Sequence, residues 1–372
     1  MQHSLRLTGL IREDITAAGG WIDFARYMEL ALYAPGLGYY SAGAAKFGEA
    51  GDFVTAPEIS ALFGRTLARQ VAQILGISGG DVLETGAGSG RLAAQLLLEL
   101  EALGCLPSRY CILEVSADLR QRQRRLLEAA APHLLERVVW LNALPPSLSG
   151  VILGNEVLDA MPVHLVAWRQ DGVHERGVAA GANGFSWHER PLTGGALFDA
   201  ARRLPVSAGY LSEVGLDAPA FVATLAQVLQ QGAVLMIDYG FGESEYYHPQ
   251  RSEGTLMCHY RHHAHGDPFY LPGLQDITAH VDFSAVAGAG IGAGMQLLGY
   301  TTQSSFLINC GIADLLAQTS PEDVGAYLPL AGQAQKLLSP AEMGELFKVV
   351  ALGKGIDEPL CGFAAGDKSR ML

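Results

Sequence analysis

Short, continuous apolar runs alternate with longer amphipathic segments from about residue 80 onward. Four apolar runs occupy residues 81–84, 110–115, 138–140 and 150–155. Strands that are buried on both faces of a sheet show such continuous runs, whereas half-exposed strands alternate. Residues 91–103 and 117–129, which lie between these runs, place apolar side chains at helical spacing. The repeated order of strand and helix predicts a doubly wound α/β fold.

The same pattern returns in the second half of the chain. We expect further elements at residues 219–230 (helix), 233–239 (strand), 284–298 (helix), 301–308 (strand) and 347–352 (strand). Only helical segments separate the last two expected strands, so we expect these strands to form an antiparallel pair at one edge of the sheet. The prediction is a Rossmann-like, mostly parallel, seven-stranded sheet with an antiparallel edge.

Three further segments do not follow this alternation of strands and helices. Residues 13–35 and 57–75 predict helices, and a long glycine-rich loop with aromatic residues lies between them. Loops of this length are uncommon unless they are functional or disordered. Residues 163–190 alternate apolar and polar side chains around turns, which predicts inserted antiparallel hairpins. Residues 240–282 form a second long insertion, rich in His and Tyr.

The 372 residues suffice for about two domains, or for one large domain with insertions. We expect six segments: a helical N-terminal region at 1–75 with a lid loop at about 35–60, the first half of the core at 76–162, an inserted hairpin segment at 163–215, a core continuation at 216–239, a substrate or lid insertion at 240–282, and the second half of the core at 283–372.

Charge and cysteine usage restrict the partners. The chain carries 25 Lys and Arg against 38 Asp and Glu, which gives a formal net charge of −13. Because proteins that neutralise phosphates are usually basic, at least locally, we expect no nucleic-acid partner. The five cysteines are scattered and form no Cys-x-x-Cys motif. This pattern disfavours a disulfide framework and predicts reduced thiols in a cytoplasmic protein.

Residues 283–313 carry no charged side chain, which raises the possibility of a membrane span. A span needs about 20 mostly apolar residues, whereas this stretch is interrupted by Thr301-Thr302-Gln303-Ser304-Ser305. We therefore expect no membrane segment. The glycine-rich helix at 288–294 and the hairpins at 163–190 are candidate faces for a homodimer.

The first apolar strand leads into a glycine loop, Glu84-Thr85-Gly86-Ala87-Gly88-Ser89-Gly90. Glycine permits a sharp turn and a close approach of a ligand to the backbone. The dinucleotide fingerprint Gly-x-Gly-x-x-Gly/Ala is not met, because Arg91 occupies its last position. A carboxylate at Glu84 repels a pyrophosphate but binds an ammonium group. The loop therefore fits S-adenosyl-L-methionine better than NAD, although a plain strand–helix turn remains an alternative.

Two further groups of polar residues follow neighbouring strands. Glu114 ends the second strand, where a carboxylate accepts hydrogen bonds from both ribose hydroxyls. Asn155 and Glu156 follow the fourth strand, and we expect Asp159 one helical turn further on. Paired carboxylates bind a guanidinium by bidentate hydrogen bonds. The alternative is that acidic residues here only complement the dipole of a helix N-terminus.

A histidine-rich stretch at 259–265 and the pair His280 and Asp282 suggest metal ligands. Their spacing matches neither His-Glu-x-x-His nor a Cys/His zinc pattern. We therefore expect no metal and assign the stretch to a substrate lid.

Seven further stretches are spread over nearly the whole chain, at residues 33–40, 51–60, 112–116, 154–162, 237–240, 276–283 and 344–348. Together they resemble the MidA-like family of bacterial and mitochondrial class I methyltransferases. The resemblance implies S-adenosyl-L-methionine as cofactor and symmetric dimethylation of a protein arginine on a subunit of the respiratory-complex-I type. It also implies a lid at Gly51–Ser60, in which Asp52 hydrogen-bonds either the donor or the guanidinium. One departure is Ser89, where the family usually has Arg.

Three rival functions remain open at this stage. They are an NAD-dependent oxidoreductase on a similar fold, a non-catalytic assembly factor that uses residues 163–215 and 240–282 as its partner surface, and a methyltransferase for small molecules or nucleic acid.

Overall fold

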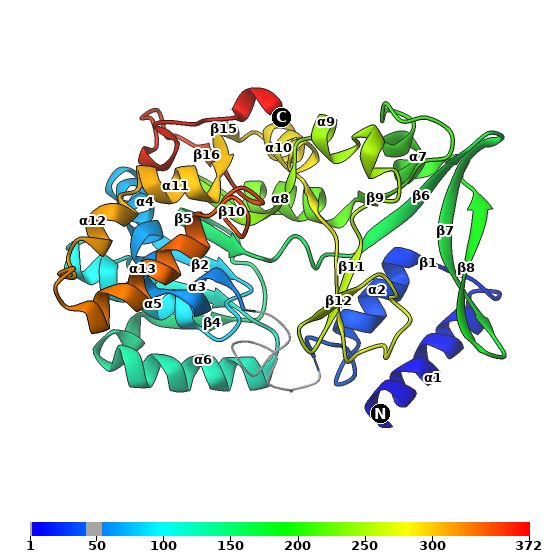
Figure 1. Ribbon diagram of the computed structural model, residues 1–372, viewed down its shortest axis with the longest axis horizontal. Coiled ribbons are helices and arrows are strands. Elements are labelled where there is room, and N and C mark those ends of the chain that lie inside the picture. The colour runs from blue at the N-terminus through cyan, green and yellow to red at the C-terminus, as the bar shows by residue number, and fades with distance from the viewer. Residues whose placement is uncertain (1, 42–53) are drawn as a thin grey trace. The chain divides into compact units, whose positions relative to one another are not determined.

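The computed structural model describes residues 2–41 and 54–372 (Figure 1). The chain divides into two compact units. One, the α/β unit, comprises residues 54–157, 221–240 and 283–372, and the other, the hairpin unit, comprises residues 1–53, 158–220 and 241–282. The six expected segments remain predictions, and the part of the lid at 42–53, with Asp52, lies outside the described residues.

A mixed sheet forms the centre of the α/β unit. Its strands run in the order β15-β16-β10-β5-β2-β3-β4. Their bounds are β2 (Asp81–Thr85), β3 (Tyr110–Leu113), β4 (Val138–Leu141), β5 (Leu148–Asn155), β10 (Leu229–Phe241), β15 (Gln296–Thr302) and β16 (Phe347–Lys354). The pairs from β10 to β4 are parallel, whereas β16 pairs antiparallel with both β10 and β15. The short β14 (Val281–Asp282) belongs to the hairpin unit.

Helices accompany these strands in the order that the sequence indicates (Figure 1). They are α3 (Ala56–Ile59), α4 (Ala61–Ser78), α5 (Arg91–Ala102), α6 (Ala117–Ala130), α8 (Asp217–Val228), α10 (Phe283–Gly292), α11 (Gln303–Asn309), α12 (Ile312–Leu316) and α13 (Val324–Leu338). Short 3-10 turns lie at Pro132–Arg137, Cys361–Phe363 and Ser369–Met371. Apolar side chains of α4 and α5, such as Val71 and Leu97, are fully buried with Val82 and Val151 of the sheet in one core. The predicted helices at 91–103 and 117–129 are confirmed.

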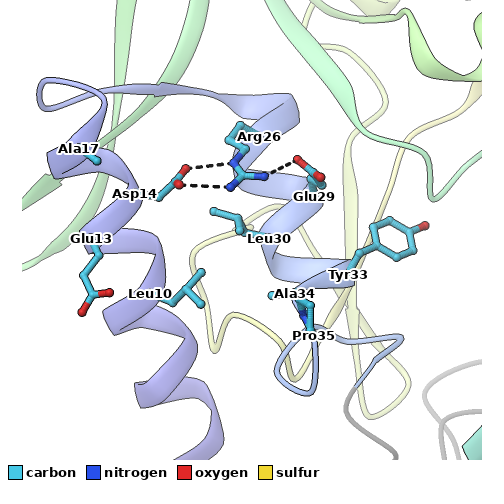
Figure 2. Close-up of a pocket in the computed structure, with 10 residues that line it drawn as sticks. All are labelled: Leu10, Glu13, Asp14, Ala17, Arg26, Glu29, Leu30, Tyr33, Ala34 and Pro35. Carbon is cyan, nitrogen blue, oxygen red and sulfur yellow. Dashed lines mark hydrogen bonds and ion pairs between the residues drawn. The ribbon is translucent and has the colours of Figure 1, made fainter. Parts of the chain in front are cut away.

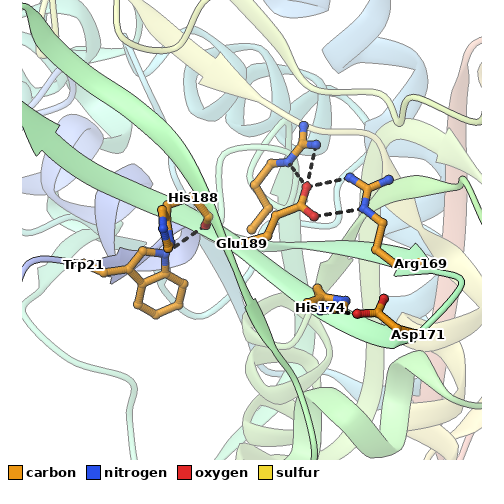
Figure 3. Close-up of polar contacts among 7 residues, drawn as sticks. Trp21, Arg169, Asp171, His174, His188 and Glu189 are labelled. Carbon is orange, nitrogen blue, oxygen red and sulfur yellow. Dashed lines mark hydrogen bonds and ion pairs between the residues drawn. The ribbon is translucent and has the colours of Figure 1, made fainter.

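The hairpin unit contains antiparallel sheets, as predicted for residues 163–190. Its elements are α1 (Gln2–Ala17), β1 (Ile22–Asp23), α2 (Phe24–Tyr33), β6 (Val163–Arg169), β7 (Gly172–Gly181), β8 (Gly184–Pro191), α7 (Gly195–Ala201), β9 (Leu211–Gly215), α9 (Glu243–Tyr246), a 3-10 turn at Pro249–Arg251, β11 (Met257–Tyr260), β12 (His263–His265) and β13 (Asp276–Thr278). Arg169 and Arg176 both hold Glu189 across this sheet, and the indole of Trp21 donates to the carbonyl of His188 (Figure 3).

Several of the predicted elements are wrong. The helix expected at 284–298 ends at Gly292, and residues 296–298 belong to β15. The helix expected at 13–35 is interrupted, because Gly19 and Gly20 adopt φ of 78° and 93° and the chain then forms β1. The strand expected at 301–308 instead ends at Thr302, whose hydroxyl accepts from the backbone N–H of Ser305 and begins α11. Among the described helices, none combines the length and the apolar character needed to cross a membrane.

Candidate functional site

The glycine loop joins the end of β2 to the start of α5 in the α/β unit. Gly86, Gly88 and Gly90 have φ of 65°, 51° and 86°, in the left-handed region that glycine adopts without a steric penalty. A Cβ on Gly86 would lie 2.8 Å from Cγ2 of Val157. The loop therefore lies against the turn that follows β5, as expected at the carboxyl edge of parallel strands.

Glu84 lies at the end of β2 with only 2% of its surface exposed. The hydroxyl of Tyr110 on β3 donates a 2.7 Å hydrogen bond to its Oε2. Burial raises the pKa of Glu84 to about 7, although the hydrogen bond from Tyr110 acts in the opposite direction. A positively charged ligand group beside Glu84 would favour its ionised form, because opposite charges stabilise one another.

Glu114 directly follows β3 and is connected to the glycine loop. Its Oε1 accepts from the backbone N–H of Ser116 at 2.8 Å, and its Oε2 accepts from Nε2 of Gln123 at 3.3 Å. The same Gln123 amide donates to the carbonyl of Gly88 at 3.1 Å. Burial raises the pKa of Glu114, and these hydrogen bonds oppose the shift. The structure thus brings Glu114 and the glycine loop together through one side chain.

Asn155 ends β5, and Glu156 begins the turn after it. Glu156 has φ of 54°, a conformation that costs a non-glycine residue about 1–3 kcal/mol and is found mostly at functional sites. Its Oε1 accepts from Nδ2 of Asn155 at 3.1 Å and from the backbone N–H of Ala56 at 3.4 Å. In the part of the chain that the structure describes, the buried Oδ1 of Asn155 has no hydrogen-bond partner. Such an atom is costly to bury without a ligand or water.

Sequence reasoning missed Asp238, which holds this turn in place. Asp238 lies on β10 with no exposed surface. Its Oδ2 accepts from the backbone N–H of Val157 at 3.1 Å, and its Oδ1 accepts from that of Tyr239 at 2.9 Å. The signal in the sequence was the acid at the end of a buried apolar run, in Ile237-Asp238-Tyr239-Gly240.

Sequence reasoning also missed Glu58, on the short helix α3. Its Oε1 accepts from the hydroxyl of Ser89 at 2.5 Å, and its Oε2 forms an ion pair with Nε of Arg91 at 2.7 Å. Glu58 therefore ties α3 to the glycine loop.

The structure does not place Asp159 on a helix. Residues 156–162 form bends and turns, so the expected position one helical turn after Glu156 is wrong. Asp159 belongs to the hairpin unit, is 6% exposed, and accepts at its backbone carbonyl from the N–H of Ala279.

The histidine-rich stretch forms the antiparallel pair β11–β12, in which Cys258 lies opposite His265. His280 stacks on Phe241, with ring centroids 5.2 Å apart. Elsewhere in the hairpin unit, a groove of about 500 Å³ lies along α1 and α2 (Figure 2). Its most prominent polar feature is Arg26, which is held by Asp14 and Glu29.

The mixed α/β sheet and the glycine loop at its carboxyl edge place this protein in the class of α/β enzymes that bind a ligand at the ends of parallel strands, and its similarity to a solved methyltransferase structure shows the methyltransferase fold. A family model with the description "Putative S-adenosyl-L-methionine-dependent methyltransferase" matches residues 65–301. The chain belongs to this family, which confirms the predicted enzyme class and its cofactor, S-adenosyl-L-methionine.

Individual relatives agree with this family. The protein arginine methyltransferase NDUFAF7, mitochondrial, of Mus musculus is 30% identical over 371 residues, covering 90% of this chain and 81% of the relative. The Danio rerio protein of the same name is 29% identical over 369 residues, covering 89% and 83%. The crystal structure of a Burkholderia thailandensis protein bound to S-adenosyl-homocysteine has a TM-score of 0.97 and 54% identity, covering 100% of this chain and 97% of that chain.

Proposed function

We propose that this methyltransferase transfers methyl groups to the terminal nitrogens of an arginine side chain in a protein. The observation that carries the proposal is the strained, carboxylate-bearing Glu156 beside the glycine loop. A carboxylate binds a guanidinium through two parallel hydrogen bonds. The names of the Mus musculus and Danio rerio relatives support the same substrate class.

The residues of the α/β unit fit S-adenosyl-L-methionine as donor. Its ribose hydroxyls need acceptors, which Glu114 offers, and its ammonium group needs a carboxylate, which Glu84 offers. The buried Oδ1 of Asn155 is a further acceptor that the described residues leave unused. The 54% identical Burkholderia thailandensis protein was crystallised with S-adenosyl-homocysteine bound, and we assign the equivalent product site in this chain to the glycine loop, Gly86, Gly88 and Gly90.

When bound, S-adenosyl-L-methionine supplies a methyl group on a positively charged sulfur. Glu156 then orients the guanidinium so that one terminal nitrogen faces this methyl group. Orientation is the main contribution that an enzyme makes to such a displacement. A free guanidinium is a poor nucleophile because its pKa exceeds about 12, and the negative charge of Glu156 holds the positive charge away from the attacking nitrogen. As the bond from this nitrogen to the methyl carbon forms, the carbon–sulfur bond of the donor would break and leave a neutral thioether. The nitrogen would release its proton to water late, after the positive charge has been transferred to the guanidinium. From the sequence, Asp159 remains a predicted acidic contact of the acceptor, and Asp52 a predicted hydrogen-bond partner of either the donor or the guanidinium.

The finer predictions belong to the same proposal. Symmetric dimethylation requires that the acceptor leaves after the first methyl group and returns with its second terminal nitrogen in place. The acceptor is a subunit of the respiratory-complex-I type. A seven-stranded class I core, a homodimer and a cytoplasmic location remain predictions from the sequence, and the relatives in animals carry the word mitochondrial in their names.

The test is to supply purified enzyme and labelled S-adenosyl-L-methionine to a protein extract from a strain that lacks the gene. Peptide mass spectrometry then locates the methyl groups. We expect label on arginine, as symmetric dimethylarginine, in the extract that receives active enzyme. Label only on small molecules or nucleic acid would contradict the proposal. A parallel fluorescence titration with NADH, in which we expect no binding, tests the oxidoreductase alternative.

A further inference from the structure

Three side chains from three strands converge on one face of the sheet in the hairpin unit. β8 pairs with β7 along residues 174–181 and occupies one edge of β7. β6 and β1 also pair with β7, so both must lie along its other edge. β6 pairs with β7 as far as Leu165 opposite Arg176, and β1 continues with Asp23 opposite Gly177. The two strands therefore meet end to end beside β7.

The register places Asp23, His164 and Glu175 on the same face. Glu175 lies opposite Val166, and His164 is two residues from Val166, so it is the diagonal neighbour of Glu175. Gly177 is two residues from Glu175 and lies opposite Asp23. Side chains two residues apart in a strand, or directly opposite across a pair, point to one face. The other face, with Ile22, Leu165 and Val178, is packed in the core.

The donor atoms of these three side chains lie close enough for one ion. One ligand atom from each residue lies within 4.8 Å of the other two, and Nδ1 of His164 is 2.7 Å from Oε1 of Glu175. Two donors of an ion at about 2.1 Å are separated by about 3 to 4 Å, so only small side-chain movements are needed. The side chains of His164 and Glu175 are 23% and 15% exposed, which leaves access for an ion and for additional water ligands.

No arginine or lysine within residues 2–41 and 54–372 balances the charges at this position. Among the described residues, neither Asp23 nor Glu175 forms an ion pair with either type of side chain. The neighbouring guanidinium groups are engaged elsewhere, since Arg26 binds Asp14 and Glu29, and Arg176 binds Glu189. Asp217 adds a further negative charge near His164. Several carboxylates around one imidazole give this position a local excess of negative charge, which stabilises a bound divalent cation.

We infer that Asp23, His164 and Glu175 form a binding site for one divalent transition-metal ion. One imidazole nitrogen with two carboxylate oxygens suits zinc, manganese or cobalt better than calcium or magnesium, which prefer oxygen ligands alone. The site joins α2, which Asp23 caps through the N–H of Arg26, to β6 and β7. Metal binding therefore fastens α2 to the sheet, independently of methyl transfer.

The test uses the full-length protein after removal of metal with a chelator. Calorimetric titration with zinc chloride is expected to show one ion per chain with micromolar affinity, and cobalt chloride to give the absorption bands of a nitrogen- and oxygen-coordinated ion. His164→Ala and Glu175→Gln should each weaken binding at least tenfold. Zinc should also raise the melting temperature of the wild type and not that of Glu175→Gln, provided that circular dichroism shows both to be folded.

A matched control is the surface pair of His133 and Glu101, whose Nε2 and Oε2 are 2.9 Å apart. Among the described residues, this pair belongs to no group of three possible metal ligands. His133→Gln should bind zinc as the wild type does. Absence of stoichiometric binding in the wild type would overturn the proposal. Equal binding by all variants, or loss of binding on replacing His263 and His265 instead, would also overturn it, because the ion would then bind elsewhere.

Discussion

The backbone N–H of Val157 donates a 3.1 Å hydrogen bond to Oδ2 of Asp238. Asp238 is fully buried on β10, and Val157 lies in the turn after β5. Between β5 and Val157, Glu156 adopts its left-handed backbone conformation. A carboxylate from one strand therefore fixes the backbone of the residue that we assign to the acceptor guanidinium.

Asp238→Asn tests this positioning role. The amide presents only one acceptor oxygen, so one of the two backbone N–H groups loses its partner, at a cost of about 1–3 kcal/mol in the free energy of unfolding. We expect kcat for methyl transfer to fall about tenfold or more, while the Kd for S-adenosyl-L-methionine changes less than about twofold. The measurement is a kcat and KM determination alongside calorimetric donor binding.

Glu213→Gln is the matched control, because Glu213 is also buried and accepts from the backbone N–H groups of Thr255 and Leu256. This variant should lose similar stability and retain the kcat of the folded enzyme. Equal losses of kcat in the two variants would mean that Asp238 acts only through general stability.

Glu58→Gln tests the connection between α3 and the glycine loop. Removing the charge weakens the bonds from Ser89 and Arg91, and hydrogen bonds to charged groups contribute about 1.5–3 kcal/mol. We expect donor affinity to fall about tenfold, because the loop must then be ordered on binding. Glu99→Gln removes an ion pair of the same 2.7 Å length, between Arg65 and Glu99, that does not touch the loop. Donor affinity should be unchanged in that control, and an equal fall in both variants would argue against a specific role of Glu58.

We predict that the buried carboxyl group of Glu84 makes the free energy of unfolding depend on pH. Burial raises its pKa from 4.5 to about 7, so between these values the folded protein holds a proton that the unfolded chain has released. The contribution of Glu84 to the free energy of unfolding therefore falls as pH rises from 4.5 through 7. The glutamine of Glu84→Gln does not titrate. The free energy of unfolding of this variant, minus that of the wild type, should therefore rise by up to about 3 kcal/mol between pH 5 and pH 8. Urea unfolding at both pH values measures this, and a constant difference would contradict it.

The same carboxyl group tests the assignment of the donor ammonium. A cation beside Glu84 lowers its pKa and so releases a proton when the donor binds near pH 7. Calorimetric binding in two buffers of different ionisation enthalpy should show this release for the wild type and not for Glu84→Gln. Binding enthalpies that do not depend on the buffer would place the ammonium group elsewhere.

We predict that Glu189 makes the free energy of unfolding depend on pH with the opposite sign. The hydrogen bonds from Arg169, with those from Arg176, lower its pKa from 4.5 to about 2, although burial opposes them. Its contribution to stability is therefore fully present above about pH 5 and is lost as pH falls through 2. Because the side chain is one-quarter exposed, we expect Glu189→Gln to cost about 1–2 kcal/mol at pH 7. In urea unfolding, this cost should diminish toward pH 3, and a pH-independent cost would contradict the account.

The core of the α/β unit could be predicted because its strands are apolar on both faces and short. Residues 81–84 and 150–155 lie within β2 and β5 as expected. The wrong elements were those in which a local backbone signal outweighed apolar periodicity. Gly19 and Gly20 interrupt one expected helix, and the hydroxyl of Thr302 begins a helix where an apolar strand was expected.

The candidate site was predicted only in part, for a different reason. The glycine loop, Glu114, Asn155 and Glu156 stand at strand ends, which a sequence pattern reveals. Asp238 acts on a residue 81 positions away, and Glu58 on one 31 positions away. Their roles depend on how distant segments pack, so no local pattern marks them.

The most direct test of the central claim compares two quantities in Glu156→Gln. We predict that this variant binds S-adenosyl-L-methionine with nearly the wild-type Kd, while its rate of methyl transfer to protein arginine falls about 100-fold. Glu128→Gln, on the exposed face of α6, should retain both. Gly88→Val should abolish donor binding, because Gly88 has φ of 51° and a β-branched side chain is strained there. Wild-type transfer by Glu156→Gln, or unchanged donor binding by Gly88→Val, would contradict the account.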